Sequence, residues 1–412
     1  MTRVEIEKAF RRYLAARVVS VAGSVVSVVA LPVLVYQLTG SAGWTSAVAV
    51  AEALPYLLFG LVAGAVADRA PRRVLMVGLE LATAVLLASV PLAWWLGLLT
   101  AVHVLLVAFA VQVLFVFFDA ANFGALPTLV GRAKLTAAYS KLYGATTIVE
   151  VAVPPLAGLA VVLAAPAPLM ALNAVTAVAS ALLIRAITRP LSAVPAGERP
   201  ARLWSDIGAG LGFLRREPVV RLLTLVGMTH AAAGGAWVAM LVPFADQALG
   251  VRASGDARLA VLFACWGIGG VLAARLVPRL GARFGPARFA LTALPCSLLA
   301  AVATTLTTHW LLAVLTVICW GTAHSAVVLN AVTYRQQLSP DELQARVNTT
   351  GRMLAWGVGQ PAGAALAGAV AVTGAGARGG LVAGTAVLAA GVAFAWLSPT
   401  LRARARTPEP LA

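Results

Sequence analysis

Charged residues are scarce in this 412-residue chain: Asp, Glu, Lys and Arg make up 11% of it, whereas 61% of the residues are hydrophobic. Soluble domains have about 25% charged and about 45–50% apolar residues, so an ordinary soluble protein is excluded. Apolar stretches of membrane length follow one another from Val18 to Leu397. Twelve spans of about 20 residues would use about 240 residues and leave short connections. The composition therefore predicts a polytopic membrane protein.

The chain also has few cysteines and few lysines. Cys265, Cys296 and Cys319 all lie inside predicted spans, which argues against a disulfide framework. The Arg-rich, Lys-poor usage indicates a GC-rich bacterial genome. Residues 1–16 are charged and amphipathic and lack a small-residue cleavage site, so they are expected to form a cytoplasmic approach helix and not a signal peptide.

Motifs for enzyme chemistry are missing. The sequence has no GxxxxGK[ST] loop, no HExxH, no CxxC and no nucleophile elbow. Gly208-x-Gly210-x-Gly212 follows no predicted strand and is a poor nucleotide motif. The net charge of +16 is not interleaved with exposed aromatic residues, as a nucleic-acid surface would require. We expect no enzyme activity, catalytic residue, metal, cofactor or nucleic-acid partner.

The fold class expected from these patterns is an all-α polytopic membrane protein with twelve transmembrane helices in two pseudo-symmetric six-helix bundles. The apolar runs divide the chain into 1–188 (first bundle), 189–218 (cytoplasmic linker with an amphipathic helix), 219–398 (second bundle) and 399–412 (cytoplasmic tail). The predicted helices are 17–39, 44–67, 74–98, 102–122, 142–165, 168–188, 219–247, 257–278, 288–306, 310–334, 348–372 and 380–398.

The basic residues predict the orientation of the chain. With both termini inside, all of them except Arg252, Arg258 and Arg378 fall on the cytoplasmic side. We expect a multi-pass protein of the bacterial cytoplasmic membrane, surrounded by the lipid bilayer.

The two halves of the chain resemble each other. Tyr36–Gly40 (YQLTG) recurs as Asp246–Gly250 (DQALG), at an offset of 210 residues. Six helices return the chain to its starting side, so the repeat is parallel. This arrangement is typical of a two-bundle transporter whose site lies between the halves.

A glycine- and arginine-rich motif follows the second predicted helix. Two glycines in a GxxxG spacing are expected to allow close helix contact. Arginines after them would keep the loop inside and could pair with carboxylates, and an acid early in the third helix is expected to join this network. The residues are Gly60, Gly64, Asp68, Arg69, Arg72, Arg73 and Glu80.

This motif, GAVADRAPRR, resembles the loop signature G-x-x-x-D-R-x-G-R-R/K of the major facilitator superfamily, with Pro71 where a glycine is usual. The segments ALPVLVYQLTGSA, FDAANFGALPTLV, GLGFLRREPVVRLL and SPDELQARVN are similar to the enterobactin-exporter and macrolide-efflux group of that superfamily. The resemblance implies a monomer that exports a small-molecule substrate (a drug, siderophore or other natural product) against protons by alternating access.

Other functions stay open at this point. One is an uncoupled facilitator or importer of a metabolite or lipid-like substrate. Another is a non-transporting membrane sensor or scaffold.

Acidic residues inside the spans are candidates for proton coupling, because a carboxylate in hydrocarbon is costly. Glu150 lies eight residues into its predicted helix, about 12 Å from the cytoplasmic end. Its alternative role is a helix-interface carboxyl bonded to Thr146. Glu52 is a similar candidate, with a structural role as its alternative.

Asp119 and two histidines complete the proton-coupling candidates. Asp119 could form a gating pair with Arg346 or Arg352 in one conformational state. His230 and His324 attract notice because imidazole titrates near physiological pH, although a membrane histidine can equally be a hydrogen-bonded packing residue.

The resemblance further implies that the first, fourth, seventh and tenth helices line the substrate cavity. Their polar and aromatic residues, as cavity candidates, are Ser24, Ser27, Gln112, Phe115, Trp237, Met240, Trp320 and Asn330.

Overall fold

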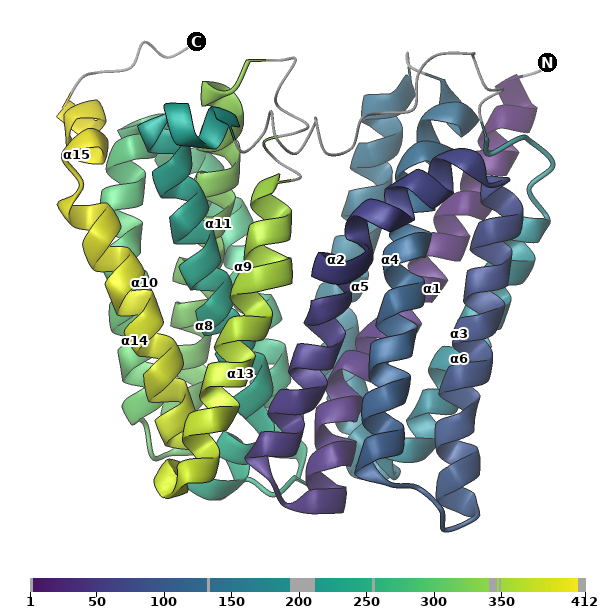
Figure 1. Cartoon of the computed structure of the whole chain (residues 1–412), viewed down its shortest axis with the longest axis horizontal. Helices are drawn as coiled ribbons and strands as arrows, with labels where there is room; N and C mark the ends of the chain where they lie inside the picture. The colour runs from purple at the N-terminus through teal and green to yellow at the C-terminus, as the bar shows by residue number, and fades with distance from the viewer. Residues whose placement is uncertain are drawn as a thin grey trace. The chain divides into compact units, whose positions relative to one another are not determined.

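The computed structural model describes residues 3–131, 134–192, 212–253, 256–340, 347 and 350–406, and within these ranges the regular secondary structure is helical. Contacts divide the chain into an N-terminal unit (Met1–Thr39 and Pro55–Arg199) and a C-terminal unit (Gly40–Leu54 and Pro200–Ala412). The division falls inside one long helix, at Pro55, where the missing N–H weakens the helical hydrogen bonding. Figure 1 shows the helices of each unit.

Six long helices begin in the first half of the chain. They are α1 (Arg3–Thr39), α2 (Ala42–Arg69), α3 (Arg72–Trp95), α4 (Ala101–Val130), α5 (Leu135–Leu163) and α6 (Pro166–Arg185). The approach helix expected over residues 1–16 is not separate, because α1 runs without a break from Arg3 to Thr39.

The second half contains α8 (Pro218–Leu249), α9 (Ala257–Phe284), α10 (Pro286–Leu306), α11 (Trp310–Leu338), the π-helix η2 (Met353–Gly359), α13 (Gln360–Val370), η3 (Ala371–Ala375), α14 (Gly376–Leu397) and α15 (Pro399–Arg406). The tail predicted over 399–412 therefore begins with a short helix. The linker helix predicted within 189–218 falls mostly outside the described residues, which show helix at 212–216.

Among the described residues, eleven segments are long and apolar enough to cross a membrane, and the last of them is a run of 48 residues, Thr350–Leu397. A bilayer core needs about 20 helical residues, so this run is long enough to cross twice. It breaks at Gly374 and Gly376, whose φ angles are 94° and 62°. Dividing the run at this break gives the twelve crossings that the sequence predicts.

The repeated motif has the same backbone in both halves. The helices α1 and α8 end at Thr39 and Leu249, and the next residues, Gly40 and Gly250, both have a φ of 62°. Glycine adopts this left-handed conformation without the steric cost of a Cβ atom. The sequence repeat is therefore also a repeat of helix termination.

Gly60 and Gly64 make no close contact among the described residues of the N-terminal unit, and their predicted role in helix contact stays a prediction. A Cβ atom built at either glycine meets no atom within 4 Å. The close approach in this unit occurs at Gly23 instead, where an added Cβ would overlap Asn173 and Thr176 of α6. In the C-terminal unit, Gly235 of α8 lies in the same way against the backbone carbonyl of Gln360.

Candidate functional site

Five aromatic rings form a cluster inside the C-terminal unit. His230 and Trp237 are seven residues apart on α8, and Trp320 and His324 are four apart on α11, so each pair shares one helix face. Trp266 of α9 completes the cluster. Its ring lies 5.0 Å from His324, 5.2 Å from Trp320 and 6.0 Å from Trp237, centroid to centroid. These separations are those of favourable aromatic pairs.

The two histidine rings lie 5.4 Å apart. Nδ1 of His230 is 2.9 Å from the carbonyl oxygen of Val226. A carbonyl can only accept, so this nitrogen carries the hydrogen and leaves Nε2 as an acceptor. That Nε2 is buried and has no hydrogen-bond partner among the described residues, and the same holds for Nδ1 of His324.

The cluster has a buried side and a partly accessible side. His230, Trp237 and Trp320 are each at most 3% exposed, whereas Trp266 and His324 are half-buried. Nε1 of Trp320 is also buried without a hydrogen-bond partner in the described part of the chain. Three polar nitrogens without hydrogen-bond partners thus lie among apolar rings. Each buried polar atom that lacks a hydrogen bond lowers the free energy of unfolding by about 1–3 kcal/mol.

The other cavity candidates of the C-terminal unit are packing residues in this conformation. Met240 is fully buried and lies against Gly380 of α14. Asn330 is 4% exposed and donates to the carbonyl of Pro286 at 3.0 Å. Their assignment to a substrate cavity stays a prediction.

A second polar cluster lies inside the N-terminal unit, around Arg17 and Glu80. Glu80 is 5% exposed and accepts a hydrogen bond from Ser180 of α6 at 2.8 Å. Arg17 of α1 is 8% exposed and interacts electrostatically with both Glu80 and Glu150. Its Nε and Nη1 atoms have no hydrogen-bond partner among the described residues, and its guanidinium carbon lies 5.1 Å from the ring centre of Phe118.

Glu80 was expected to join the arginines of the loop, and the structure places it with Arg17 and Ser180 instead. Arg17 was not among the candidates because it stands at the predicted start of a span. The sequence carries a signal for it: Tyr13, Arg17, Ser20, Ser24 and Ser27 follow helical spacing and form a polar stripe in an apolar helix.

The serines of this stripe bond within the N-terminal unit. Ser24 donates to the carbonyl of Ser20 at 3.0 Å. Ser27 is buried and accepts from Asn173 Nδ2 of α6 at 2.6 Å. Ser27 therefore joins two helices in this conformation, and a role in substrate contact stays a prediction.

The remaining candidates form no hydrogen bond with either cluster in the described part of the chain, although Glu150 lies within electrostatic reach of Arg17. Glu150 is exposed on α5, and the bond expected from Thr146 is replaced by a bond from Thr146 to the carbonyl of Tyr143 at 3.3 Å. Asp119 accepts from the hydroxyl of Tyr56 at 3.3 Å. Of its two predicted partners, Arg346 lies outside the described residues and Arg352 belongs to the C-terminal unit, so the gating pair stays a prediction. Three further half-buried candidates are Glu52, Gln112 and Phe115.

The loop arginines bind backbone carbonyls of their own unit. Nη1 of Arg72 donates to Gly124 of α4 at 3.0 Å, and the backbone N–H of Arg72 donates to Ser192 at 2.9 Å. Arg73 donates to the carbonyl of Arg189. Cations near the C-terminal half of a helix also complement its dipole.

These bonds fasten the α2–α3 turn to α4 and to the segment after α6. Arg69 is the exposed last residue of α2, and the side chain of Asp68 lies outside the described part of the structure.

No group of three or more His, Cys, Asp or Glu side chains that could hold a metal is found among the described residues. The two clusters offer chemistry of other kinds. The cluster of the C-terminal unit can accept a proton and present flat apolar rings, and the cluster of the N-terminal unit holds a fixed cation against a carboxylate.

Comparison with known proteins gives three findings. The family model of the Major Facilitator Superfamily matches residues 13–355. The multidrug efflux pump Tap of Mycobacterium bovis is 32% identical over 226 residues, and the protein of the same name in Mycobacterium tuberculosis matches equally. This alignment spans 53% of each chain, so the match covers about half the length of these curated relatives.

Solved structures match over nearly the whole chain. A bacterial homologue of the human lysosomal transporter Spinster, in an inward-facing and unoccupied conformation, superposes with a TM-score of 0.77 at 16% identity and 100% coverage of both chains. The nucleoside transporter NupG gives 0.76 at 12% identity, covering 96% of this chain and 98% of its own. At these identities the likeness establishes the fold.

Proposed function

The chain belongs to the major facilitator superfamily, a family of transporters and not of enzymes, and we propose that it exports small amphipathic organic molecules in exchange for protons by alternating access. Its helices make it a multi-pass membrane protein. Bacterial cytoplasmic-membrane location, cytoplasmic termini and a monomeric state are parts of the same proposal.

The observation that carries the proposal is the histidine pair: buried His230 and half-buried His324 each have a ring nitrogen without a hydrogen-bond partner among the described residues. Neutral His230 already uses Nδ1 toward Val226, so a proton that arrives can bind at Nε2, an acceptor without a partner in the described structure. A ligand or proton shifts a conformational equilibrium through different affinities for its two states. We propose that the affinity of this nitrogen for protons changes when the conformation gives it a partner or water.

The distance between the rings sets the expected stoichiometry. Two positive rings 5.4 Å apart would repel each other by about 3 kcal/mol at an effective dielectric constant of about 20. This repulsion weakens the binding of a second proton on the order of 100-fold. The pair therefore takes up one proton per cycle.

The aromatic cluster supports an amphipathic substrate. Trp266 and His324, the half-buried members, offer ring surface on which a flat apolar molecule can stack. Pockets for such ligands are mostly apolar, with a few placed polar groups. The half-chain similarity to a multidrug efflux pump supports export over import.

Glu150 remains the second candidate for the proton site. Its side chain is exposed on α5, and a carboxylate that faces hydrocarbon would be costly. We propose that it faces water, where it can exchange protons near Arg17.

Dye transport into inside-out vesicles tests the proposal, with ethidium as the probe and an imposed acidic interior as the driving force. The wild type should accumulate ethidium in response to the gradient. His230→Gln and His324→Gln should each reduce this accumulation at least tenfold, because the ring that binds the proton is lost. His103→Gln is the matched control, since His103 lies in the N-terminal unit and bonds to Ser89.

Other outcomes separate the alternatives. Ethidium movement that ignores the gradient in the wild type would indicate an uncoupled facilitator. No movement of ethidium or of related amphipathic dyes would favour an importer of another substrate class, or a sensor. Loss of coupling in Glu150→Gln, with the histidine variants still coupled, would place the proton at Glu150.

A further inference from the structure

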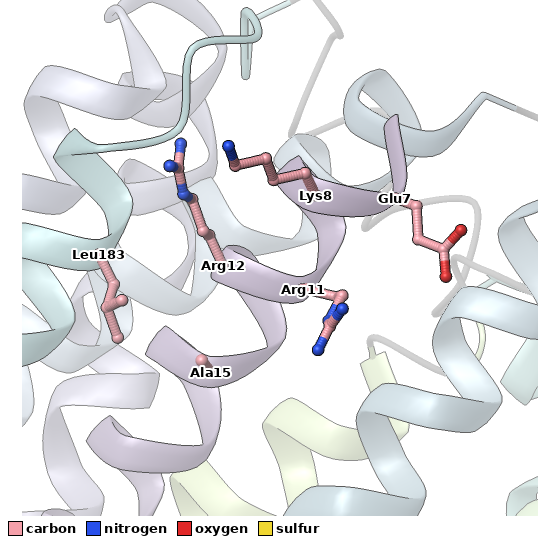
Figure 2. Close-up of a pocket in the computed structure, with 6 residues that line it drawn as sticks. All are labelled: Glu7, Lys8, Arg11, Arg12, Ala15 and Leu183. Atoms are coloured by element: carbon pink, nitrogen blue, oxygen red, sulfur yellow. The ribbon is translucent and has the colours of Figure 1, made fainter. Parts of the chain in front are cut away.

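A basic cavity of about 610 Å³ lies at one end of the N-terminal unit, between the first turns of α1 and the last turns of α6 (Figure 2). It is lined by Glu7, Lys8, Arg11, Arg12, Ala15 and Leu183. Its volume is in the range of small-molecule sites, which are about 300–1,000 Å³. The transport function proposed above does not use this cavity.

The helical register of α1 concentrates positive charge on this cavity. Lys8, Arg11, Arg12 and Ala15 follow the spacing i, i+3, i+4, i+7 and so share one face. In Figure 2 the side chains of Lys8 and Arg12 extend toward the end of α6, whereas Glu7 extends away from them. Because Glu7 extends away, the side of the cavity that faces α6 carries net positive charge.

One of the basic residues is fixed in place and two are exposed. Nη1 of Arg12 donates to the carbonyl of Ala186, just after α6, at 2.5 Å. Lys8 and Arg11 are exposed, and neither makes an ion pair among the described residues. The cavity thus has a fixed guanidinium and two further cations whose charge is available to a ligand.

The lower wall of the cavity is apolar and continues along the membrane-spanning surface. Ala15 and Leu183 form this wall. Further along α6, Leu182, Val175 and Leu172 are 58%, 64% and 50% exposed. Exposed apolar side chains on a membrane-spanning helix present a surface suited to acyl chains. Positive charge therefore lies directly beside a lipid-facing apolar strip.

We infer that this cavity binds the headgroup of an anionic phospholipid. Lys8 and Arg12 hold the phosphodiester, Arg11 adds positive charge from the adjoining side of α1 (Figure 2), and the acyl chains follow the exposed residues of α6. Clusters of basic residues at a membrane surface attract anionic lipids, and basic pockets between membrane helices bind their headgroups. The apolar wall distinguishes this site from a site for a free anion, because a free anion has no acyl chain to pack against that wall.

Native mass spectrometry of the detergent-purified full chain tests the inference, with phosphatidylglycerol and phosphatidylcholine of identical acyl chains as the two probes. The wild type should bind one phosphatidylglycerol more tightly than phosphatidylcholine. Each basic residue near a membrane surface contributes about fivefold in affinity, so Lys8→Gln with Arg11→Gln should weaken phosphatidylglycerol about 25-fold. Arg12 is left unchanged because it tethers α6.

Two matched variants make the result specific. Lys8→Arg with Arg11→Lys keeps both charges and should restore binding to within about twofold. Lys134→Gln with Lys141→Gln removes the same charge from exposed positions on or next to α5 and should leave binding unchanged. If the neutral cavity variant is unstable, raising the salt from 50 to 300 mM should weaken phosphatidylglycerol binding to the wild type and leave phosphatidylcholine unaffected.

Three results would overturn the inference. Equal binding of the two lipids would mean that charge does not select the ligand. Equal losses in the cavity variant and the α5 control would mean that binding follows net charge and not this site. Displacement of phosphatidylglycerol by millimolar inorganic phosphate would identify a free-anion site instead of a lipid site.

Discussion

Removing the charge of Glu80 tests how the polar cluster of the N-terminal unit is stabilised. Glu80→Gln keeps an oxygen that can accept from Ser180 but leaves Arg17 as a buried cation without its carboxylate. Removing one partner of a directly bonded buried ion pair costs about 3–5 kcal/mol. Arg17 acts on Glu80 electrostatically without a direct bond among the described residues, so the lower end of this range is the upper limit here. Interhelical hydrogen bonds in membrane proteins average about 0.6 kcal/mol and reach about 1.7. We expect the free energy of unfolding to fall by up to about 3 kcal/mol in Glu80→Gln and by less than about 1.7 kcal/mol in Ser180→Ala.

A double-mutant cycle separates the charge from the hydrogen bond. Unfolding would be followed by tryptophan fluorescence during titration with dodecyl sulfate. In an Arg17→Met background, Glu80→Gln should cost less than about 1 kcal/mol, because no buried cation remains to be compensated. The exposed acid Glu7, changed to Gln, is the control and should change stability by less than about 0.5 kcal/mol. A coupling energy between Arg17 and Glu80 below about 0.5 kcal/mol would refute the reasoning.

Three further positions, two of them with a matched control substitution, have expected outcomes. The methyl group added by Gly124→Ala overlaps the guanidinium of Arg72, so this substitution should lower the melting temperature in detergent. The control Gly144→Ala meets no described atom within 4 Å and should leave the free energy of unfolding unchanged or raise it by up to about 1 kcal/mol. Gly235→Ala overlaps the backbone of α13 and should reduce the folded fraction in size-exclusion chromatography, while Gly227→Ala on the same helix should not. Asp256 caps α9, and hydrogen bonds from Arg258 hold the pKa of its carboxyl below the ordinary value. The contribution of this carboxylate to the free energy of unfolding should therefore be constant above about pH 4 and fall as acid protonates the carboxyl. Asp256→Asn should lack that fall in thermal scans from pH 6 to pH 3, and parallel curves for the two proteins would contradict this.

The helices could be predicted from the sequence because most are long apolar runs that end at or next to a charged residue, a glycine or a proline. The first span was expected to end at residue 39, and α1 ends at Thr39. The start was wrong because charged residues 3–16 continue the same helix, and helical propensity does not change at a membrane surface. The break between the last two spans was predicted, but the left-handed glycines Gly374 and Gly376 that produce it were not.

The site could be predicted less fully, because proximity between helices depends on packing that one sequence does not reveal. His230 and His324 were selected for their chemistry, and their 5.4 Å separation was not foreseen. Trp266 was missed because nothing in α9 marks its face as functional. The GxxxG spacing of Gly60 and Gly64 shows the same limit: it permits close contact but does not say which helix approaches, and no described atom of the unit lies within 4 Å of a Cβ built at either glycine.

The two halves share a backbone repeat but differ in the chemistry of their interiors. Both end a long helix at a glycine with a φ of 62°, Gly40 and Gly250. The N-terminal unit buries a permanent cation, Arg17, which stays charged at all physiological pH values. The C-terminal unit also buries a permanent cation, Arg335, and in addition buries His230, which is charged only when protonated. A proton can bias a conformational equilibrium only through groups whose charge it changes. Substitutions around Arg17 should therefore change stability more than coupling, and substitutions around His230 should change coupling more than stability.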